Sequence, residues 1–511
     1  MLPLLVAAGT ALAVLVVDLI TQPRWRWPLG VGLLGAAATA VTAALTEPRQ
    51  IGTFCAGLAA PGSDAIMPVD CALVFDSRAR LVSVLIAALT VGALLLYAPA
   101  LRRGDAPAGE TVFLFACAMT GGVALAAAGD LITLIVALET LTIPLYALVA
   151  LHRRRAGEAA AAAVTFFVNS VAATAVSLLG AALLYLASGT VQLRGLVSAP
   201  LFATGEWRPV ALTGLALILV GLGFKVAAAP LHAWAPATYE GAPVPVAAFL
   251  STASKLGGVV AILIVVDGVL ATGAAGDDRS MFITAGITLA VLAALSMLVG
   301  TLVALRQRRT VRLLAWSSIA QAGFILAPLG GLTGLTLAAQ ADGLLDAALE
   351  YTVFFLVLEL AAFSAVVALR PEAPDGGTLE DLRGLGRTAP WRAAALTFAL
   401  VGLAGLPPML AGLFAKITVI QALLQVDSYR LAVLVALISV VGLAVYWRPI
   451  AALYRAAPDL RAAPDLAQAP DLAPATRVPW APAAALGLAI AAGLLLTVDP
   501  QLVYTAVTAW R

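Results

Sequence analysis

Charged and metal-binding side chains are scarce in this chain of 511 residues. Only 11% of the residues are charged, and there are three cysteines and two histidines. Soluble globular domains carry about a quarter of charged residues. Three cysteines offer no cluster that could hold an iron–sulfur centre, and two histidines in different settings argue against haem ligation. No GxGxxG segment lies between a strand and a helix. We therefore expect that this chain holds no redox centre of its own.

Lysine makes up only a small part of the positively charged residues. Of 30 Lys and Arg residues only three are lysine, namely Lys225, Lys255 and Lys416. All three lie in apolar runs, whereas almost all arginines lie between such runs. A GC-rich codon bias would explain the scarcity of lysine but not these positions. Arginine keeps its proton inside a protein, whereas a desolvated lysine can release it. The placement therefore indicates that the three amines exchange protons.

Long apolar runs make up most of the chain. Apolar residues reach 62%, the mean hydropathy is +1.01, and runs near 20 residues recur, which predicts an all-α polytopic membrane protein. The first run has no basic residues before it, so we expect a membrane span and not a cleaved signal. Fourteen spans are predicted, at residues 1–20, 28–46, 79–98, 110–128, 130–151, 160–188, 209–229, 243–271, 281–304, 311–334, 342–369, 389–422, 429–455 and 478–498.

The arginines are divided unequally between the two sides of these spans. Loops after odd-numbered spans hold 19 arginines and the opposite side holds 8. By the positive-inside rule, both termini are expected on the outer side of a bacterial plasma membrane. Cys55 and Cys71 share the outer loop after span 2, where a disulfide is permitted, although two free thiols fit the sequence nearly as well.

Two spans combine glycine, proline and one lysine. Span 7 reads GLGFKVAAAP and span 12, five spans later, reads GLAGLPPMLAGLFAK. Interrupted spans at corresponding positions are typical of inverted-repeat transporters with a site near the membrane midplane. We expect helix breaks at Pro230 and at Pro407 and Pro408, and two inverted five-helix repeats made of spans 4–8 and 9–13. The predicted organisation is three N-terminal spans, two repeats, a linker and a last span, at residues 1–109, 110–271, 272–455, 456–477 and 478–511.

The predicted linker has its own short repeat. APDL occurs three times at a six-residue period between spans 13 and 14. Proline at this density prevents a helix. The segment is expected to be a Pro-rich cytoplasmic linker, with a docking motif as the alternative.

An acidic residue lies in the middle of span 5. Glu139 is about ten residues into its span and Lys225 about sixteen into span 7, so at 1.5 Å per residue both fall near the midplane. A charge there costs about 2.5–3.5 kcal/mol on insertion scales. We expect the two side chains to face each other within about 6 Å, directly or through one water. A buried ion pair that only fixes helix packing is the alternative.

Four further residues are candidates for the same chemistry. Lys255 has no acidic neighbour in the sequence and lies too deep in span 8 for its stem to reach the interface. Lys416 follows the two prolines of span 12, whose break should leave carbonyl groups free to face the ammonium. His232 is either a relay or a packed neutral histidine. Glu359 lies in mid-span, and its partner and role are left open.

Three segments carry a family resemblance. They read FKVAAAPLHAWAPATYEGAPVPVAAFLSTASK, RLLAWSSIAQAGFIL and LRGLGRTAPWRAAALTFALVGLAGLPPMLAGLFAK. They resemble subunit N of respiratory complex I, the proton-translocating NADH:quinone oxidoreductase. The wider group comprises the antiporter-like subunits, which include Mrp cation/proton antiporters and membrane-bound hydrogenase subunits. The resemblance covers spans 4 to 13. It implies a translocase subunit whose partners are other membrane-arm subunits, with NAD, FMN, iron–sulfur clusters and quinone held by partner subunits.

The resemblance also implies a proton pathway through Glu139, Lys225, Lys255 and Lys416. The sequence departs from the family pattern at two places. It has no lysine near the start of span 6, and Gln321 stands where a histidine often follows SSIA. Three alternatives therefore stay open, namely an Mrp-type cation/proton antiporter, a hydrogenase-type subunit, and a scaffold of the membrane arm that does not pump. Whether H⁺ or Na⁺ is carried also stays open.

Overall fold

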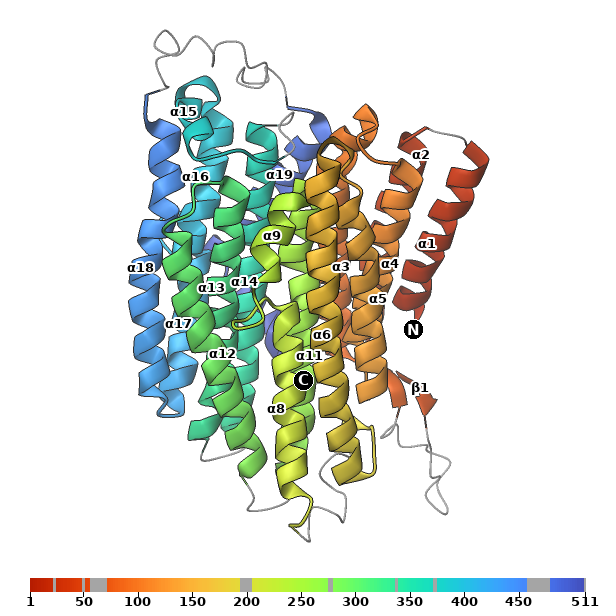
Figure 1. The fold of residues 1–511 in the computed structure, drawn as a ribbon, viewed down its shortest axis with the longest axis vertical. Coiled ribbons are helices and arrows are strands. Elements are labelled where there is room, and N and C mark those ends of the chain that lie inside the picture. The colour runs from red at the N-terminus through yellow and green to blue at the C-terminus, as the bar shows by residue number, and fades with distance from the viewer. Residues whose placement is uncertain are drawn as a thin grey trace.

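The computed structural model describes residues 1–21, 24–47, 51–55, 71–193, 205–273, 279–335, 339–370, 375–456 and 478–509. This part of the chain forms a bundle of long helices with a short β-hairpin at one end (Figure 1). The APDL repeats of the predicted linker lie outside the described residues.

Thirteen helical segments in the described part are long and apolar enough to cross a membrane, and two shorter apolar helices add one broken span. Each of the fourteen predicted spans coincides with one of these, so the predicted fold class is confirmed. In chain order the spans are α1 Leu2–Thr21, α2 Arg26–Leu45, α3 Ser77–Arg103, α4 Ala108–Ala126, α5 Leu131–Ala150, α6 Ala156–Ser188, α8 Arg208–Lys225, α10 Val244–Phe249 with η3 Leu250–Ser254 and α11 Lys255–Gly273, α12 Ser280–Ala304, α13 Thr310–Gly330, α14 Ala339–Leu369, α16 Pro390–Ala404 with α17 Ala411–Gln425, α18 Tyr429–Tyr454 and α19 Trp480–Val498.

Smaller elements connect or flank these spans. They are β1 Ile51–Cys55, β2 Cys71–Phe75, η1 Arg153–Arg155, α9 Trp234–Gly241, η4 Gly331–Gly334, η5 Glu380–Leu382, α15 Leu385–Thr388 and α20 Gln501–Thr508. The strands β1 and β2 pair antiparallel, with Cys55 opposite Cys71. These two cysteines form a disulfide, which decides between the two possibilities that the sequence left open.

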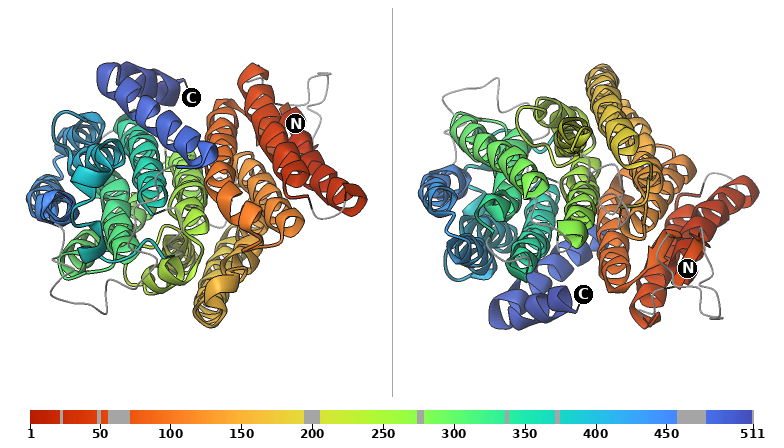
Figure 2. Two further views of the ribbon diagram at one scale, coloured as in Figure 1. Left: turned by 90° about the horizontal axis from the view of Figure 1, so that it is seen from above. Right: turned by 90° about the horizontal axis from the view of Figure 1, so that it is seen from below.

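The helices differ greatly in how far they are covered by their neighbours. Seen from above, α1 and α2 lie at one end of the elongated outline and α18 near the other (Figure 2). All of the apolar window of Val244–Leu270 is buried, and 94% of that of Thr310–Gly334, against 22% for α1 and 28% for α18. The central helices therefore face protein and not lipid, which is where polar side chains can be kept inside a membrane.

The ten central spans form two inverted five-helix repeats. The first consists of α4, α5, α6, α8 with α9, and α10 with α11; the second consists of α12, α13, α14, α16 with α17, and α18. An odd number of helices makes the second repeat run opposite to the first. In both repeats the fourth span is broken, and both breaks contain a cis peptide bond, at Ala229–Pro230 and at Pro407–Pro408. Lys225 is the last helical residue before its break, whereas Lys416 lies in the half-helix that follows its break.

Side-chain caps and a left-handed glycine fix several helix ends. Asp130 begins α5 by accepting a hydrogen bond from the Thr133 backbone N–H at 2.6 Å, which satisfies a donor that the first helical turn leaves free. Gly405, with φ of 82°, ends α16 in a conformation that side chains rarely adopt. The end of α16 thus falls inside the broken span, where its last carbonyl groups have no partner in the helix.

Candidate functional site

Lys225 and Glu139 are each bonded to a threonine. The Lys225 residue is 3% exposed, and its Nζ donates to Thr142 Oγ1 on α5 at 2.5 Å. Glu139, one turn before Thr142, is half-buried and accepts a hydrogen bond from Thr174 Oγ1 on α6 at 2.6 Å. Among the ion pairs of the described residues, none joins Glu139 to Lys225. That the side chains of Glu139 and Lys225 lie within about 6 Å of each other stays a prediction. The two threonines are residues that the sequence did not indicate.

A close approach of α11 fixes the stem of Lys225. A Cβ at Gly258 would lie 2.8 Å from Cβ and 2.9 Å from Cγ of Lys225, and 3.0 Å from Cγ1 of Val226. These distances leave no room for a side chain at residue 258. Glycine therefore permits the helix that carries Lys255 to pack directly on the end of α8.

Lys255 lies at the junction between the two repeats. It begins α11 directly after the π-helical turn η3 and is 1% exposed. Its Nζ donates to both the backbone oxygen and Oγ of Ser318 on α13, each at 2.5 Å, and lies 5.1 Å from the ring centroid of Phe355 on α14. Turns of π-helix are frequent at functional sites. Since α13 and α14 belong to the second repeat, the amine contacts both halves of the molecule.

Glu359 on α14 belongs to the surroundings of Lys255. Its side chain is fully buried, and its Oε1 accepts a hydrogen bond from Ser251 Oγ at 2.6 Å. The hydroxyls of Ser251 and Ser318 lie 3.1 Å apart. The partner that the sequence left open is thus a serine one turn before Lys255. The only signal in the sequence for Ser318 was a pair of serines within a mostly apolar helix.

Lys416 faces the end of the preceding half-helix. Its Nζ donates to the carbonyl oxygens of Leu403 at 3.3 Å and Ala404 at 2.6 Å, the last residues of α16. Terminal carbonyls have no intrahelical partner and form the negative end of the helix dipole, so they stabilise a cation. The sequence predicted free carbonyls at this break, and the structure has them.

Gln321 takes part in a separate polar group near Lys416. Its Nε2 donates to Tyr446 Oη at 2.7 Å, and the Tyr351 hydroxyl donates to its Oε1. Tyr446 Oη also lies 2.6 Å from Ser317 Oγ. Gln321, Tyr446, Ser317 and Lys416 line one small cavity. An amide and two phenols offer hydrogen bonds but no group that titrates near neutral pH, so Gln321 and its partners are suited to hydrogen bonding and not to proton exchange.

In the described part of the chain, His232 forms no hydrogen bond to any of the three lysines. Its ring lies 5.3 Å from that of Trp316, and its Nδ1 is buried without a hydrogen-bond partner among the described residues. A relay role for His232 stays a prediction. Within the same residues no group of three or more His, Cys, Asp or Glu side chains is placed to hold a metal ion.

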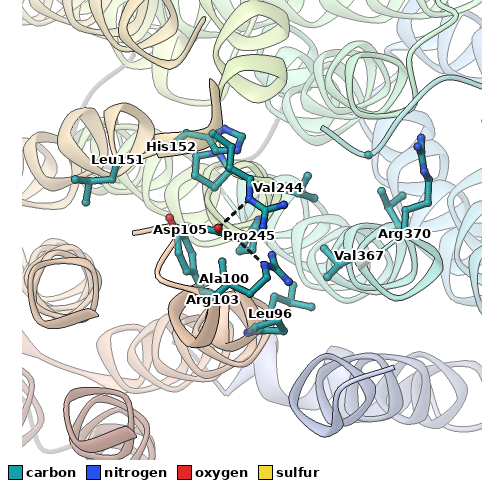
Figure 3. A pocket seen from close by; sticks show the side chains of 16 residues that line it. Leu96, Ala100, Arg103, Asp105, Leu151, His152, Val244, Pro245, Val367 and Arg370 are labelled. Carbon is teal, nitrogen blue, oxygen red and sulfur yellow. Dashed lines mark hydrogen bonds and ion pairs between the residues drawn. The ribbon is translucent and has the colours of Figure 1, made fainter. Parts of the chain in front are cut away.

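A separate cavity, which none of the three lysines lines, is walled by residues of α3, α10 and α14 and of the segment that follows α5 (Figure 3). Arg103 and Arg154 each place Nε 2.8 Å from a carboxylate oxygen of Asp105 in its wall. His152 is buried with Nδ1 3.3 Å from the Gly241 carbonyl oxygen. Burial lowers the pKa of His152, and the hydrogen bond to Gly241 offsets this only in part. The cavity is thus walled by paired charges and a histidine that favours its neutral form.

Known proteins resemble this chain along nearly its whole length. A family model described as NADH:quinone oxidoreductase/Mrp antiporter, TM, matches residues 128–442. The NADH-quinone oxidoreductase subunit N of Salinispora tropica is 56% identical over 463 residues, which cover 89% of this chain and 84% of that protein. Subunit N 2 of Streptomyces griseus is 38% identical over 514 residues, covering 98% and 91%.

Chains in two solved structures have a fold similar to that of this chain. A chain of respiratory complex I from Thermus thermophilus has a TM-score of 0.75 and 29% identity, covering 99% of both chains. A chain of the Mrp complex from Dietzia has a TM-score of 0.75 at 22% identity, over 100% of this chain and 97% of that one, which is a likeness of fold alone. By its sequence relatives and its family model, this chain belongs to the subunit N family of NADH-quinone oxidoreductase, among the antiporter-like membrane subunits.

Proposed function

We propose that this chain conducts protons through the membrane along Glu139, Lys225, Lys255 and Lys416, as part of a proton-translocating NADH:quinone oxidoreductase. One observation carries the proposal. The three lysines are 3%, 1% and 6% exposed, and each donates its hydrogen bonds to neutral oxygens of threonine, serine or the backbone. No ion pair of the described residues includes any of them.

Burial without a direct ion pair makes both protonation states of these amines accessible. Taking an ammonium out of water costs several kcal/mol, and hydrogen bonds to neutral oxygens offset only part of that cost. The neutral amine avoids the cost, so a lysine in this setting can accept a proton from one neighbour and release it to another. Arginine would stay charged at the same position.

The position of Glu139 suits a residue that connects the proposed proton pathway to a partner subunit. It is half-buried, and its neighbours on α5 one turn away, Val136 and Ile143, are 60% and 59% exposed. A carboxylate at a lipid-facing surface is costly, which supports a partner covering this face. We propose that the partners are other membrane-arm subunits, and that these or further subunits hold the NAD, FMN, iron–sulfur and quinone sites.

The arginine distribution supports the proposed placement in the membrane. The loops after odd-numbered spans, which hold 19 of the arginines, would face the cytoplasm of a bacterium, and both termini would lie on the outer side. The proposed domain division follows the repeats, with boundaries near residues 110, 272 and 456.

Two variants of Lys255 test the proposal. The whole oxidoreductase would be reconstituted into vesicles, and protons moved per electron would be measured for Lys255→Met and Lys255→Arg. We expect both variants to lose the same part of the proton-to-electron ratio, because neither side chain can release a proton. Quinone reduction and assembly should survive better with arginine, which keeps the charge. A wild-type ratio in Lys255→Arg would make Lys255 a fixed charge only, and a wild-type ratio in Lys255→Met would favour the scaffold.

A further inference from the structure

We propose that Glu359 is a further proton-carrying residue, which exchanges its proton with Lys255 through the hydroxyls of Ser318 and Ser251. The inference rests on the proton conduction proposed above. It gives a role to a carboxylate whose role the sequence left open and which lies on α14, outside the proposed pathway of Glu139 and the three lysines.

The four groups form one continuous hydrogen-bonded chain. Lys255 Nζ lies 2.5 Å from Ser318 Oγ, Ser318 Oγ lies 3.1 Å from Ser251 Oγ, and Ser251 Oγ lies 2.6 Å from Glu359 Oε1. A hydroxyl has one hydrogen to donate. Since Ser251 gives its hydrogen to the carboxylate, Ser318 must be the donor in the middle bond. Every bond of the chain therefore points from the amine to the carboxylate.

Among the described residues, Glu359 forms no ion pair with a group of permanent charge. The side chain is 0% exposed, and its second oxygen, Oε2, has no hydrogen-bond partner among the described residues. A buried carboxylate of this kind is costly when it is ionised and unpaired. An arginine would hold it ionised, but none of the described ion pairs involves Glu359. The cation reached through the hydrogen-bonded chain is Lys255, which can release its proton.

The cluster keeps the same net charge before and after the transfer. In one state Lys255 is an ammonium and Glu359 a carboxylate; in the other the amine is neutral and the acid is protonated. The ammonium gives a proton to Ser318 Oγ, Ser318 gives its own hydroxyl proton to Ser251, and Ser251 gives its own to Glu359 Oε1. Each serine ends with one proton, and its hydroxyl points the other way. No co-reactant is needed.

Glu359 lies where the two repeats meet. Glu359 comes from the second repeat, whereas Ser251 and Lys255 come from the last span of the first. A second titratable site at this junction gives Lys255 a proton donor or acceptor in the other repeat.

A fixed ion pair bridged by two serines is the competing explanation, and Glu359→Gln separates the two. Glutamine keeps an oxygen that accepts from Ser251 but cannot bind a proton. Ser251→Ala breaks the chain without changing any charge. Ser364→Ala is the matched control, because Ser364 is also fully buried on α14 and its hydroxyl has no hydrogen-bond partner in the described part of the chain.

The readouts are the proton-to-electron ratio of the reconstituted oxidoreductase and redox-induced infrared difference spectra of the same preparation. We expect Glu359→Gln and Ser251→Ala to lower the ratio as far as Lys255→Met does, with quinone reduction retained and Ser364→Ala at the wild-type ratio. A deuterium-sensitive carbonyl band of a protonated carboxylic acid should disappear in Glu359→Gln. The double variant Lys255→Met/Glu359→Gln should pump no less than either single variant, since residues in one chain act as a unit.

Two results would overturn the inference alone. One is a wild-type ratio in Glu359→Gln or, where that variant does not assemble, in Ser251→Ala, while Lys255→Met has lost pumping. The other is an additive loss in the double variant. If Lys255→Met itself keeps the wild-type ratio, the proton conduction proposed for this chain fails, and the role of Glu359 fails with it.

Discussion

Replacing Thr142 by valine would remove the hydroxyl that accepts a hydrogen bond from Lys225 and leave the shape of the residue nearly unchanged. The Thr142 residue is 1% exposed and lies 2.5 Å from Nζ. A hydrogen bond to a charged group contributes about 1.5–3 kcal/mol, and a buried donor left without a partner costs a similar amount. If proton transfer passes through the ammonium form of Lys225, its barrier rises by that energy. Because each 1.36 kcal/mol is tenfold in rate, we expect transfer through Lys225 to slow by about tenfold to a hundredfold.

Thr140 provides the matched control on the same helix. Both threonines donate their hydroxyl to the carbonyl four residues earlier, Thr140 to Val136 and Thr142 to Leu138, but only Thr142 also accepts from Lys225. In reconstituted vesicles, Thr142→Val should lower the proton-to-electron ratio, Thr142→Ser should restore it, and Thr140→Val should leave it unchanged. Wild-type pumping in Thr142→Val would refute the reasoning, because Lys225 would then exchange protons without this contact.

Two further predictions concern packing and pH. Gly258→Ala places a Cβ 2.8 Å from Cβ of Lys225, so we expect a loss of about 1–3 kcal/mol of stability. This loss should appear as a lower apparent melting temperature. A Cβ at Gly487 would meet nothing within 4 Å, so the control variant Gly487→Ala should lose no stability. Burial raises the pKa of Asp381, but hydrogen bonds to Thr378 and the Arg370 charge outweigh it and hold that pKa below its usual value. An acid whose pKa is lower in the folded than in the unfolded protein stabilises the fold at pH values above its pKa in the unfolded protein. This stabilisation is lost as the pH falls through the pKa of the acid in the folded protein. The melting difference between wild type and Asp381→Asn should therefore shrink below about pH 4, and a constant difference would contradict this.

The sequence predicted the spans and the helix breaks because both depend on local physics. A run of about 20 apolar residues can satisfy its backbone in lipid only as a helix, and the fourteen predicted spans follow this rule. Prolines remove backbone donors wherever they stand, so the breaks at Pro230 and Pro407 could be placed without knowledge of the fold. The carbonyls that face Lys416 come from residues only 12 and 13 positions away, within the same broken span.

The polar surroundings of the other two lysines could not be predicted in this way, because they come from distant parts of the chain. Ser318 lies 63 residues from Lys255, and Glu359 lies 108 residues from Ser251. Thr142 lies 83 residues from Lys225. A serine or threonine in an apolar helix usually bonds to its own backbone, so nothing in the sequence marks the few that face a lysine. Only the packing of the helices selects them, within the first repeat for Thr142 and between the two repeats for Ser318 and Glu359.

The same packing gives two mid-span carboxylates a hydroxyl as their hydrogen-bond partner. Glu139 and Glu359 both bond to a hydroxyl, Thr174 in one case and Ser251 in the other. A direct pair would hold the ammonium and the carboxylate in their charged forms, since each charge stabilises the other. Between Glu359 and Lys255 the hydroxyls of Ser251 and Ser318 weaken this attraction and can still pass a proton, because a hydroxyl both donates and accepts. In the proton conduction that we propose, these two serines leave Lys255 free to change its charge, which is the property that the placement of the lysines first indicated.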